Sequence, residues 1–491
     1  MTSADIRTTH TSTPNRPRTA TILGRSDDAP GTAGIVLRAL RGVRAPDGSV
    51  VDVYLDRDRI SAVTAASAPP PADGAAAGGT HVHEGPRPLG AEIDAHGWRI
   101  LPAAAEPHAH LDKALSAPRV DLRQNDLESA ISQWRELYAS IDRADIYQRA
   151  SDAVRRYVTH GITTIRTHVD VPAAGDAMRG VDALTRLRDE LRGRVTLQVV
   201  ALVASDTPTP VVEEAIERGV DLLGGCPHLA PDPRVETARL ADLAERHGLD
   251  VDLHTDEQVS LGEGAHDVDI AELAEQVLAR GFAHRVVASH CVRLGSLPPE
   301  RLAAVLELVR RAGLGIVTLP ITNLYLQGRD APQPAPRGLP ALRAILDLGI
   351  PLAAGGDNLR DPFNPVGRAD PFETTSLLVT AGHLTPAEAL AAVTTGARTV
   401  LGLPPVGIDA GCAADLILVP DTDLGDVLAG QVDARVVVHA GRIVADSRMA
   451  RSIDLTGTAP NTAEPTVIDS TGPTVGTVPM YSESGGERHV R

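Results

Sequence analysis

The sequence predicts an α/β fold, a (β/α)8 TIM barrel with a small β-sandwich domain formed by its N- and C-terminal segments. One observation is a repeat between about residues 101 and 400, where short runs rich in Val, Ile and Leu alternate with helical stretches eight times. Continuous apolar runs indicate strands buried on both faces, as in a parallel sheet, and eight β/α units suit a closed barrel. The other observation is that strand patterns of the half-buried kind flank this region at both ends.

The N-terminal segment of the β domain begins with a hairpin. Residues 33–66 alternate apolar and polar side chains around the Pro-Asp-Gly turn at 46–48. An Ala/Gly/Pro-rich loop over 67–90 follows, and the run "GAEIDAHGWRILPA" leads into the first barrel strand. After the barrel, "GIDAGCAADLILVP" and "DARVVVHAGRIVAD" are again β runs. They most simply join the hairpin in one small domain, so that the barrel is an insertion in it.

The barrel strands alternate with helices in chain order. After the strand that carries His108, the predicted strands are "ITTIRTHVD", "VTLQVVALV", "GVDLLGGCPH", "LDVDLHTDE", "RVVASHC", "LGIVTLP" and "IPLAAGGD". The helical stretches between them include "DRADIYQRASDAVRRYVTHG", "DPRVETARLADLAERHG", "DIAELAEQVLARG" and "PPERLAAVLELVRRAG".

These segments give five predicted regions. They are a disordered leader over 1–32, the N-terminal β-sandwich segment over 33–100, the barrel over 101–403, the C-terminal β-sandwich segment over 404–453 and a disordered tail over 454–491. The leader lacks the apolar core of a secretory signal, and the tail is rich in Thr, Pro, Gly and Ser.

Composition excludes several classes of function. A formal net charge of −17 and an aromatic content of 2% argue against a nucleic-acid groove and against binding to anionic membranes. The sequence holds no run of about 18 uncharged apolar residues that would predict a transmembrane helix. Cys226, Cys291 and Cys412 lie far apart and form no disulfide or zinc pattern, so we expect a reducing compartment, the cytoplasm.

Five side chains that can bind metal stand at the ends of predicted barrel strands. His108 and His110 end the first strand, His254 the fifth, His290 the sixth and Asp357 the eighth. These strand ends meet at one rim of a barrel, and the period-2 spacing lets His108 and His110 face one ion. The pattern predicts a divalent-metal site. Imidazole and carboxylate ligands suit Zn²⁺ or Fe²⁺, Mn²⁺ also fits, and the ligand types leave the metal open.

These residues and their surroundings resemble the amidohydrolase superfamily, and most closely its cytosine deaminase-like branch. The resemblance rests on "PHAHLDKA", "RTHVD", "LQVVAL", "HTDE", "ASHC", "NLYLQGR" and "GGDNLRDPFNPVGRADP", and spans roughly residues 33–447. The pair "HLDK" and "GDN" is also similar to N-isopropylammelide amidohydrolase-type enzymes.

The resemblance implies roles for individual residues. The metal ligands would be His108, His110, His254 and Asp357. Glu257 would be the acid/base that protonates a ring nitrogen, and Asp357 would also take a proton from the attacking water. His290 would orient and polarise that water, and Gln198 would hold an amide face of the substrate.

Two positions depart from the cytosine deaminase pattern. Asn358 stands where that branch carries a second acid; because an amide both donates and accepts hydrogen bonds, a ring other than cytosine becomes more plausible. Phe363 takes the place of the usual Trp as a smaller ring-stacking wall. His168 points to the same rim, where it either touches substrate or makes a structural hydrogen bond.

Lysine usage bears on the metal count. Lys113 is the chain's only lysine, and it either faces the substrate entrance, pairs with Asp112, or is a surface residue without a role. The predicted fourth strand therefore lacks the carboxylated lysine that bridges two metals in many amidohydrolases, which favours one metal ion per subunit. We expect His228, which follows that strand, to be structural.

The expected function is a metal-dependent hydrolytic deaminase that acts on a cytosine-like amino-substituted N-heterocycle and releases ammonia or an amine. The alternative is cleavage of a cyclic or linear amide, such as a lactam or imide, or of an N-alkylamine substituent on a triazine-like ring. A non-catalytic scaffold would need a broken ligand set or a missing acid, and the sequence shows neither. The expected partner is a small heterocyclic substrate, and the resemblance is compatible with a homo-oligomer.

Overall fold

A computed structural model of the chain describes residues 21–22, 32–66, 90–121, 126–259, 268–328 and 336–450. The predicted tail over 454–491 lies outside the described residues, and so does the predicted leader apart from residues 21, 22 and 32. Within the described ranges, no helix combines the length and the apolar character needed to cross a bilayer.

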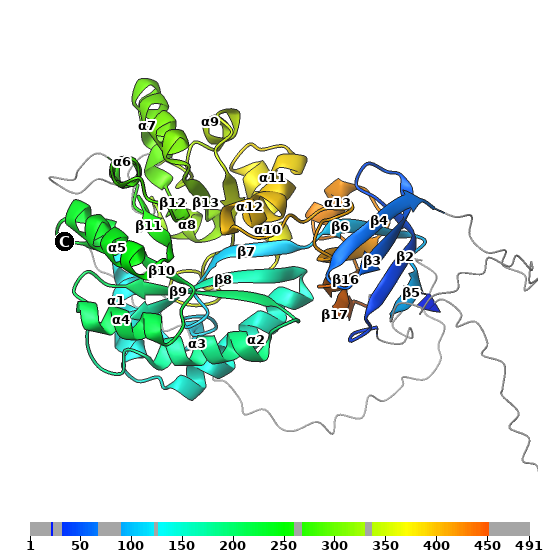
Figure 1. The fold of residues 1–491 in the computed structure, drawn as a ribbon, viewed down its shortest axis with the longest axis horizontal. Coiled ribbons are helices and arrows are strands. Elements are labelled where there is room, and N and C mark those ends of the chain that lie inside the picture. Colours follow the sequence, from blue (N-terminus) through cyan, green and yellow to red (C-terminus); the bar gives the residue numbers. More distant parts are fainter. Residues whose placement is uncertain are drawn as a thin grey trace, which may run out of the picture. The chain divides into compact units, whose positions relative to one another are not determined.

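Eight parallel strands form the barrel (Figure 1). In chain order, which is also their order in the sheet, they are β7 (Ala104–Ala109), β8 (Ile162–Val171), β9 (Thr196–Val203), β10 (Leu222–Gly225), β11 (Asp250–Thr255), β12 (Val286–His290), β13 (Gly315–Thr318) and β14 (Leu352–Ala354). Each neighbouring pair is parallel. An isolated bridge between Ala109 and Asp357 joins the first strand to the last. The predicted TIM barrel is confirmed.

Helices connect the strands and cover the outside of the barrel (Figure 1). They are α1 (Leu127–Tyr138), α2 (Arg143–Thr159), α3 (Arg179–Glu190), α4 (Thr209–Glu217), α5 (Pro233–His247), α6 (Asp269–Arg280), α7 (Pro299–Ala312), α8 (Pro320–Leu326), α9 (Leu342–Asp347), α10 (Pro371–Thr380), α11 (Pro386–Val393) and α12 (Thr395–Leu401). Three successive helices, α5, α6 and α7, end at a glycine in the left-handed conformation: Gly248, Gly281 and Gly313. A left-handed C-terminal residue ends a helix and turns the chain, here toward the next barrel strand.

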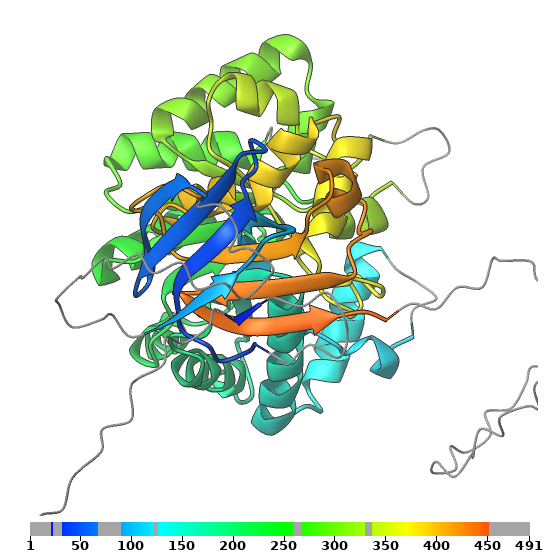
Figure 2. The same cartoon turned by 90° about the vertical axis from the view of Figure 1, so that its right-hand side faces the viewer.

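A second sheet collects strands from both ends of the chain. Its strands are β1 (Thr21–Ile22), β2 (Leu37–Arg44), β3 (Val50–Asp56), β4 (Arg59–Ala65), β5 (Ala91–Asp94), β6 (Trp98–Pro102), β15 (Leu416–Pro420), β16 (Ala434–His439) and β17 (Arg442–Arg448). The short helix α13 (Leu424–Leu428) follows β15. Figure 2 shows the blue N-terminal strands and the orange C-terminal strands in this domain. The junction is the antiparallel pairing of β6 with β15, so the barrel is an insertion in the small β domain as predicted.

The barrel and the small domain pack closely where α2 ends. Gly161 has a φ of +98°, and a Cβ there would lie 2.4 Å from Cδ1 of Ile417 in β15. Arg435 of β16 donates to the carbonyl oxygen of His160 at 3.0 Å and to both carboxylate oxygens of Asp370 at 2.9 Å. A side chain at position 161 would require the Ile417 side chain to move, and Arg435 links the two domains through its hydrogen bonds.

Candidate metal centre

Four predicted ligand side chains meet at the C-terminal rim of the barrel. His108 lies in β7 and His110 just beyond it, His254 lies in β11, and Asp357 follows β14. The Nε2 atom of His254 lies 3.1 Å from Nε2 of His108 and 3.3 Å from Nε2 of His110. Oδ1 of Asp357 lies 3.3 Å from Nε2 of His110 and 3.9 Å from Nε2 of His108. Each of these four donor atoms thus lies within 3.9 Å of two others.

These separations fit a cation. Ligand atoms placed tetrahedrally at 2.0–2.1 Å from a zinc ion are about 3.3–3.4 Å apart, close to the measured spacings. Oδ1 of Asp357 is buried and has no hydrogen-bond partner among the described residues. A buried carboxylate oxygen is costly without a partner, and a cation among the three imidazoles would supply one.

The protonation states also suit metal binding. Burial lowers the pKa of His108 and His254 well below the usual value and that of His110 to about 4, so the three rings are neutral at pH 7. Burial raises the pKa of Asp357 to about 7. Neutral imidazoles present lone pairs to a metal, and only the Asp357 proton has to leave when a metal binds.

His290, at the end of β12, is the fifth residue of the group. Its Nδ1 lies 3.0 Å from Oδ1 of Asn323, an acceptor, so Nδ1 carries a proton. Nε2 has no hydrogen-bond partner among the residues that the structure describes. His290 and Asp357 both have left-handed backbones, with φ of +71° and +62°. Such conformations cost roughly 1–3 kcal/mol each and concentrate at functional sites.

Glu257 lies beside the histidines in the loop after β11, and His228 contacts it. Oε2 of Glu257 is 3.4 Å from Nε2 of His228, and Oε1 is 4.0 Å from Nδ1 of His290. Burial alone would raise the pKa of Glu257, but His290 and His228 outweigh it and hold the pKa at about 2. Glu257 is therefore a carboxylate at neutral pH, with oxygens that accept hydrogen bonds.

His228 is more closely tied to the site than we expected from the sequence. Its Nδ1 lies 3.2 Å from the carbonyl oxygen of His254, while its Nε2 faces Glu257. Both ring nitrogens thus face acceptors. Burial lowers the pKa of His228, but the Glu257 carboxylate outweighs it and raises the pKa. A helical-turn histidine after a strand gives no sequence signal for this contact, which depends on how β10 and β11 pack.

The Glu257 loop is held by its neighbour Asp256, which has a φ of +52°. The Asp256 carboxylate accepts hydrogen bonds from the backbone N–H groups of Asp269 at 2.9 Å and Ile270 at 3.0 Å, in the first turn of α6. Arg293 donates to it at 3.3 Å. An acid at a helix N-terminus is stabilised by the free N–H groups there, so the loop is anchored to α6.

Lys113 lies close to the metal centre but its charge is neutralised. Its Nζ donates to Oδ1 of Asp170 at 2.6 Å and lies 3.6 Å from Asp112 and 3.4 Å from Nδ1 of His110. Nε1 of Trp134 donates to the other Asp170 oxygen at 2.6 Å. Lys113 is buried, with an exposed fraction of 4%. The structure thus places Lys113 in a buried ion-pair network rather than on the surface, and a contact with substrate stays a prediction.

Asn358 and Phe363 lie in the loop after β14. Nδ2 of Asn358 donates to Oδ2 of Asp361 at 2.7 Å. The other Asp361 oxygen accepts from the backbone N–H groups of Phe363 at 2.9 Å and Asn364 at 3.1 Å. The Phe363 ring is buried in an apolar cluster that contains Trp134 of α1. These bonds give the loop a fixed shape, and substrate contacts by either residue stay predictions.

His168 and Gln198 lie deeper in the barrel. The fully buried ring of His168 is 3.9 Å from the His108 ring, measured between centroids, and its two nitrogens have no hydrogen-bond partner among the described residues. Gln198 is opposite Arg166, two residues before His168 along β8, and its Oε1 accepts from Nε of Arg166 at 3.0 Å. Gln198 is thus one layer below the histidines. Its contact with substrate stays a prediction, and such a contact would require the Arg166–Gln198 hydrogen bond to break.

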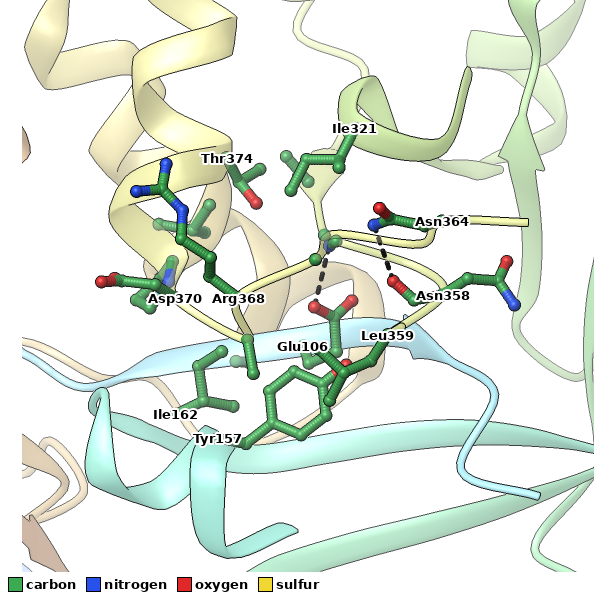
Figure 3. A pocket seen from close by; sticks show the side chains of 18 residues that line it. Glu106, Tyr157, Ile162, Ile321, Asn358, Leu359, Asn364, Arg368, Asp370 and Thr374 are labelled. Carbon is green, nitrogen blue, oxygen red and sulfur yellow. Dashed lines mark hydrogen bonds between the residues drawn. The ribbon is translucent and has the colours of Figure 1, made fainter. Parts of the chain in front are cut away.

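Glu106 is a buried acid that we did not select from the sequence. It precedes His108 by two residues, and its Oε2 accepts from the backbone N–H of Gly356 at 2.8 Å (Figure 3). Its Oε1 accepts from the backbone N–H of His108 at 3.3 Å. Tyr157 and Thr374 line the same small pocket, which none of the clustered histidines lines. Glu106 thus links the backbone before Asp357 to β7. The sequence feature that could have identified it is an acidic residue within an apolar strand.

Comparisons with known proteins identify relatives of this chain. The sequence model of the Amidohydrolase family matches residues 122–445. A pterin deaminase from Rhizobium rhizogenes is 32% identical over 368 residues, which cover 72% of this chain and 82% of that protein. An N-isopropylammelide isopropyl amidohydrolase from Pseudomonas sp. is 25% identical over 371 residues, 72% of this chain and 87% of that protein. The crystal structure of 5-methylcytosine deaminase from Klebsiella pneumoniae, liganded with 5-fluorocytosine, superposes with a TM-score of 0.73 at 25% identity, over 85% of this chain and 99% of that chain.

Proposed function

This chain belongs to the amidohydrolase family, and from that premise we propose that it is a metal-dependent hydrolytic deaminase of an amino-substituted nitrogen heterocycle. Membership confirms the predicted superfamily and the predicted enzyme class, a hydrolase of carbon–nitrogen bonds other than peptide bonds. The observation that carries the proposal is the meeting of His108, His110, His254 and Asp357 at donor spacings of 3.1–3.9 Å, beside the carboxylate of Glu257.

We propose one divalent cation, zinc or iron, with manganese also compatible with the ligands. When bound, this ion supplies Lewis acidity that activates water near neutral pH. A second, bridged ion lacks a ligand from β10, because the strand ends in Gly224 and Gly225. A Cβ at Gly224 would lie 2.7 Å from the carbonyl oxygen of Asp252 and 3.4 Å from Nδ1 of His168, which leaves no room for a bridging side chain.

The chain's own residues divide the proton transfers. Glu257 begins as a carboxylate, so one of its oxygens takes a proton from water and delivers it to a ring nitrogen. His290, with its Nδ1–H directed at Asn323, has an Nε2 that is without a hydrogen-bond partner among the described residues, and this atom orients the same water. Asp357 takes the remaining proton as water adds to the ring carbon and passes it to the exocyclic nitrogen, which then leaves as ammonia or an amine.

The relatives narrow the substrate class. The relative at 32% identity is a pterin deaminase, so we propose pterins as the first substrates to test, followed by other amino-substituted heterocycles with one ring or two fused rings. The second candidate is removal of an alkylamine from a triazine-like ring, which the N-isopropylammelide amidohydrolase at 25% identity favours. The three cysteines are free among the described residues, and we propose that the enzyme works in the cytoplasm, without nucleic-acid or membrane partners.

Release of ammonia from a panel of rings tests the proposal. Zinc- or iron-loaded protein is incubated with pterins, cytosines, amino-triazines and N-alkylamino-triazines, and ammonia and amine are measured separately. We expect ammonia from at least one amino ring, loss of activity with a chelator and recovery with metal. The Glu257→Gln variant, which keeps the shape but cannot take the proton, is the control and should be inactive. A ring-opened acid without free ammonia would instead support amide hydrolysis, and no turnover of any ring by metal-loaded protein would refute the proposal.

A further inference from the structure

A continuous line of buried polar groups runs beneath the metal centre, from His108 across three barrel strands. Nδ1 of His108 lies 2.9 Å from Oγ of Ser289 in β12. That hydroxyl donates to Oδ1 of Asp252 in β11 at 2.9 Å, and Oδ2 of Asp252 accepts from Nη1 of Arg166 in β8 at 2.8 Å. His108, Ser289, Asp252 and Arg166 all have an exposed fraction of 0%.

The chemistry of these groups fixes the direction of each bond. Asp252 is paired with the Arg166 guanidinium, which always carries its charge, so the carboxylate acts only as an acceptor. The Ser289 hydroxyl has one proton and gives it to Asp252. Its lone pair is therefore what faces His108, and Nδ1 of His108 must carry a proton. The neutral ring then has its lone pair on Nε2, the atom that faces His254, His110 and Asp357.

Arg166 makes the far end of this line rigid. Besides Asp252, it donates through Nε to Oε1 of Gln198 at 3.0 Å and through Nη2 to the carbonyl oxygen of Leu401 at 3.2 Å. All three nitrogens of the guanidinium are thus used. Gln198 and Leu401 therefore hold the Arg166 side chain in place.

We propose that Ser289, oriented by Asp252 and Arg166, is a positioning residue that selects the Nδ1–H tautomer of His108 and aims Nε2 at the cation. This positioning role rests on the proposed function in one respect, namely that the site binds a cation. Residues beyond the ligands that fix the tautomer and ring orientation of a ligating histidine typically change metal affinity roughly 10- to 100-fold when removed.

Zinc affinity of metal-free protein tests this role without reference to activity. Ser289→Ala leaves Nδ1–H of His108 without an acceptor, and the expected result is a Kd for Zn²⁺ roughly 10- to 100-fold weaker in competition with a chromogenic chelator. Ser289→Thr keeps the hydroxyl and should restore affinity most of the way. Ser151→Ala makes the same change in α2, where the hydroxyl donates to the carbonyl oxygen of Tyr147, and should leave affinity unchanged. Circular dichroism and thermal melts of all three variants establish that they fold.

The outcomes separate this inference from the proposed function. Folded Ser289→Ala protein that binds Zn²⁺ like wild type overturns the positioning role, and equal losses in Ser289→Ala and Ser151→Ala overturn it as well. The expected affinity pattern without turnover of any heterocycle supports the positioning role and refutes the proposed function. Wild-type protein that binds no Zn²⁺ at all overturns both.

Discussion

Replacing His228 tests whether its contact with Glu257 serves catalysis. The ring makes two contacts that separate variants can remove one at a time. His228→Asn keeps an N–H near the position of Nδ1, which faces the His254 carbonyl oxygen at 3.2 Å, and loses the contact with Glu257. His228→Gln places an N–H near the position of Nε2, which faces Glu257 at 3.4 Å, and loses the bond to His254.

The expected fall in kcat depends on how well Glu257 is held once the His228 contact is removed. Glu257 has an exposed fraction of 6%, so water cannot fully replace a lost partner. Hydrogen bonds to charged groups contribute about 1.5–3 kcal/mol, so loss of this longer 3.4 Å contact is expected to cost at most about 10- to 150-fold in rate. We therefore expect His228→Asn to lower kcat by up to that factor and His228→Gln to lower it by less, with KM changed little in either.

The assay is steady-state ammonia release by metal-loaded enzyme on the substrate found in the panel, with bound metal measured for each variant. Matched metal content is essential, because His228 also contacts the backbone of His254. If His228→Asn retains wild-type kcat, or if His228→Gln is the more impaired variant at equal metal content, the contact with Glu257 does not contribute and the reasoning is wrong.

Three further predictions concern other regions of the site. Burial raises the pKa of Asp357 from 3.8 to about 7, so the folded metal-free protein keeps a proton that the unfolded chain releases, and its stability falls as pH rises from about 4 to 7. Zn²⁺ replaces that proton and should raise Tm more at pH 8 than at pH 5.5; equal shifts by differential scanning fluorimetry would contradict this. Lys113→Met leaves the Asp170 carboxylate without its closest cation, so we expect the free energy of unfolding in denaturant to fall by about 3–5 kcal/mol. Adding Asp170→Asn should recover part of this loss, and no recovery would show that the ion pair is not its cause. Asn358→Asp puts a carboxylate where Nδ2 now donates to Asp361 at 2.7 Å, so we expect the variant to lose more Tm relative to wild type at pH 8 than at pH 5. We also expect no gain of cytosine deamination, measured as ammonia released from cytosine.

Much of the site could be predicted because the C-terminal ends of all the barrel strands lie at the same rim. His108, His254 and Asp357 are separated by more than a hundred residues at each step, yet each ends a parallel strand and so reaches the same rim. No local pattern marks His228 in the same way, because it faces Glu257 only through the packing of the loops after β10 and β11. Gln198 shows the opposite case, since its depth in the barrel depends on strand register, which the sequence pattern leaves open by two residues or more.

The sequence by itself determined the fold class, the family and the residues able to bind a metal, because these depend on the period of apolar residues and on side-chain chemistry. Only the tertiary structure decided how those residues are oriented and protonated. The tautomer of His108 depends on Ser289, Asp252 and Arg166, which lie on three different strands. The physical reason is that hydrogen-bond direction and pKa depend on distances of about 3 Å and on exclusion of water, and both arise only when distant strands pack together.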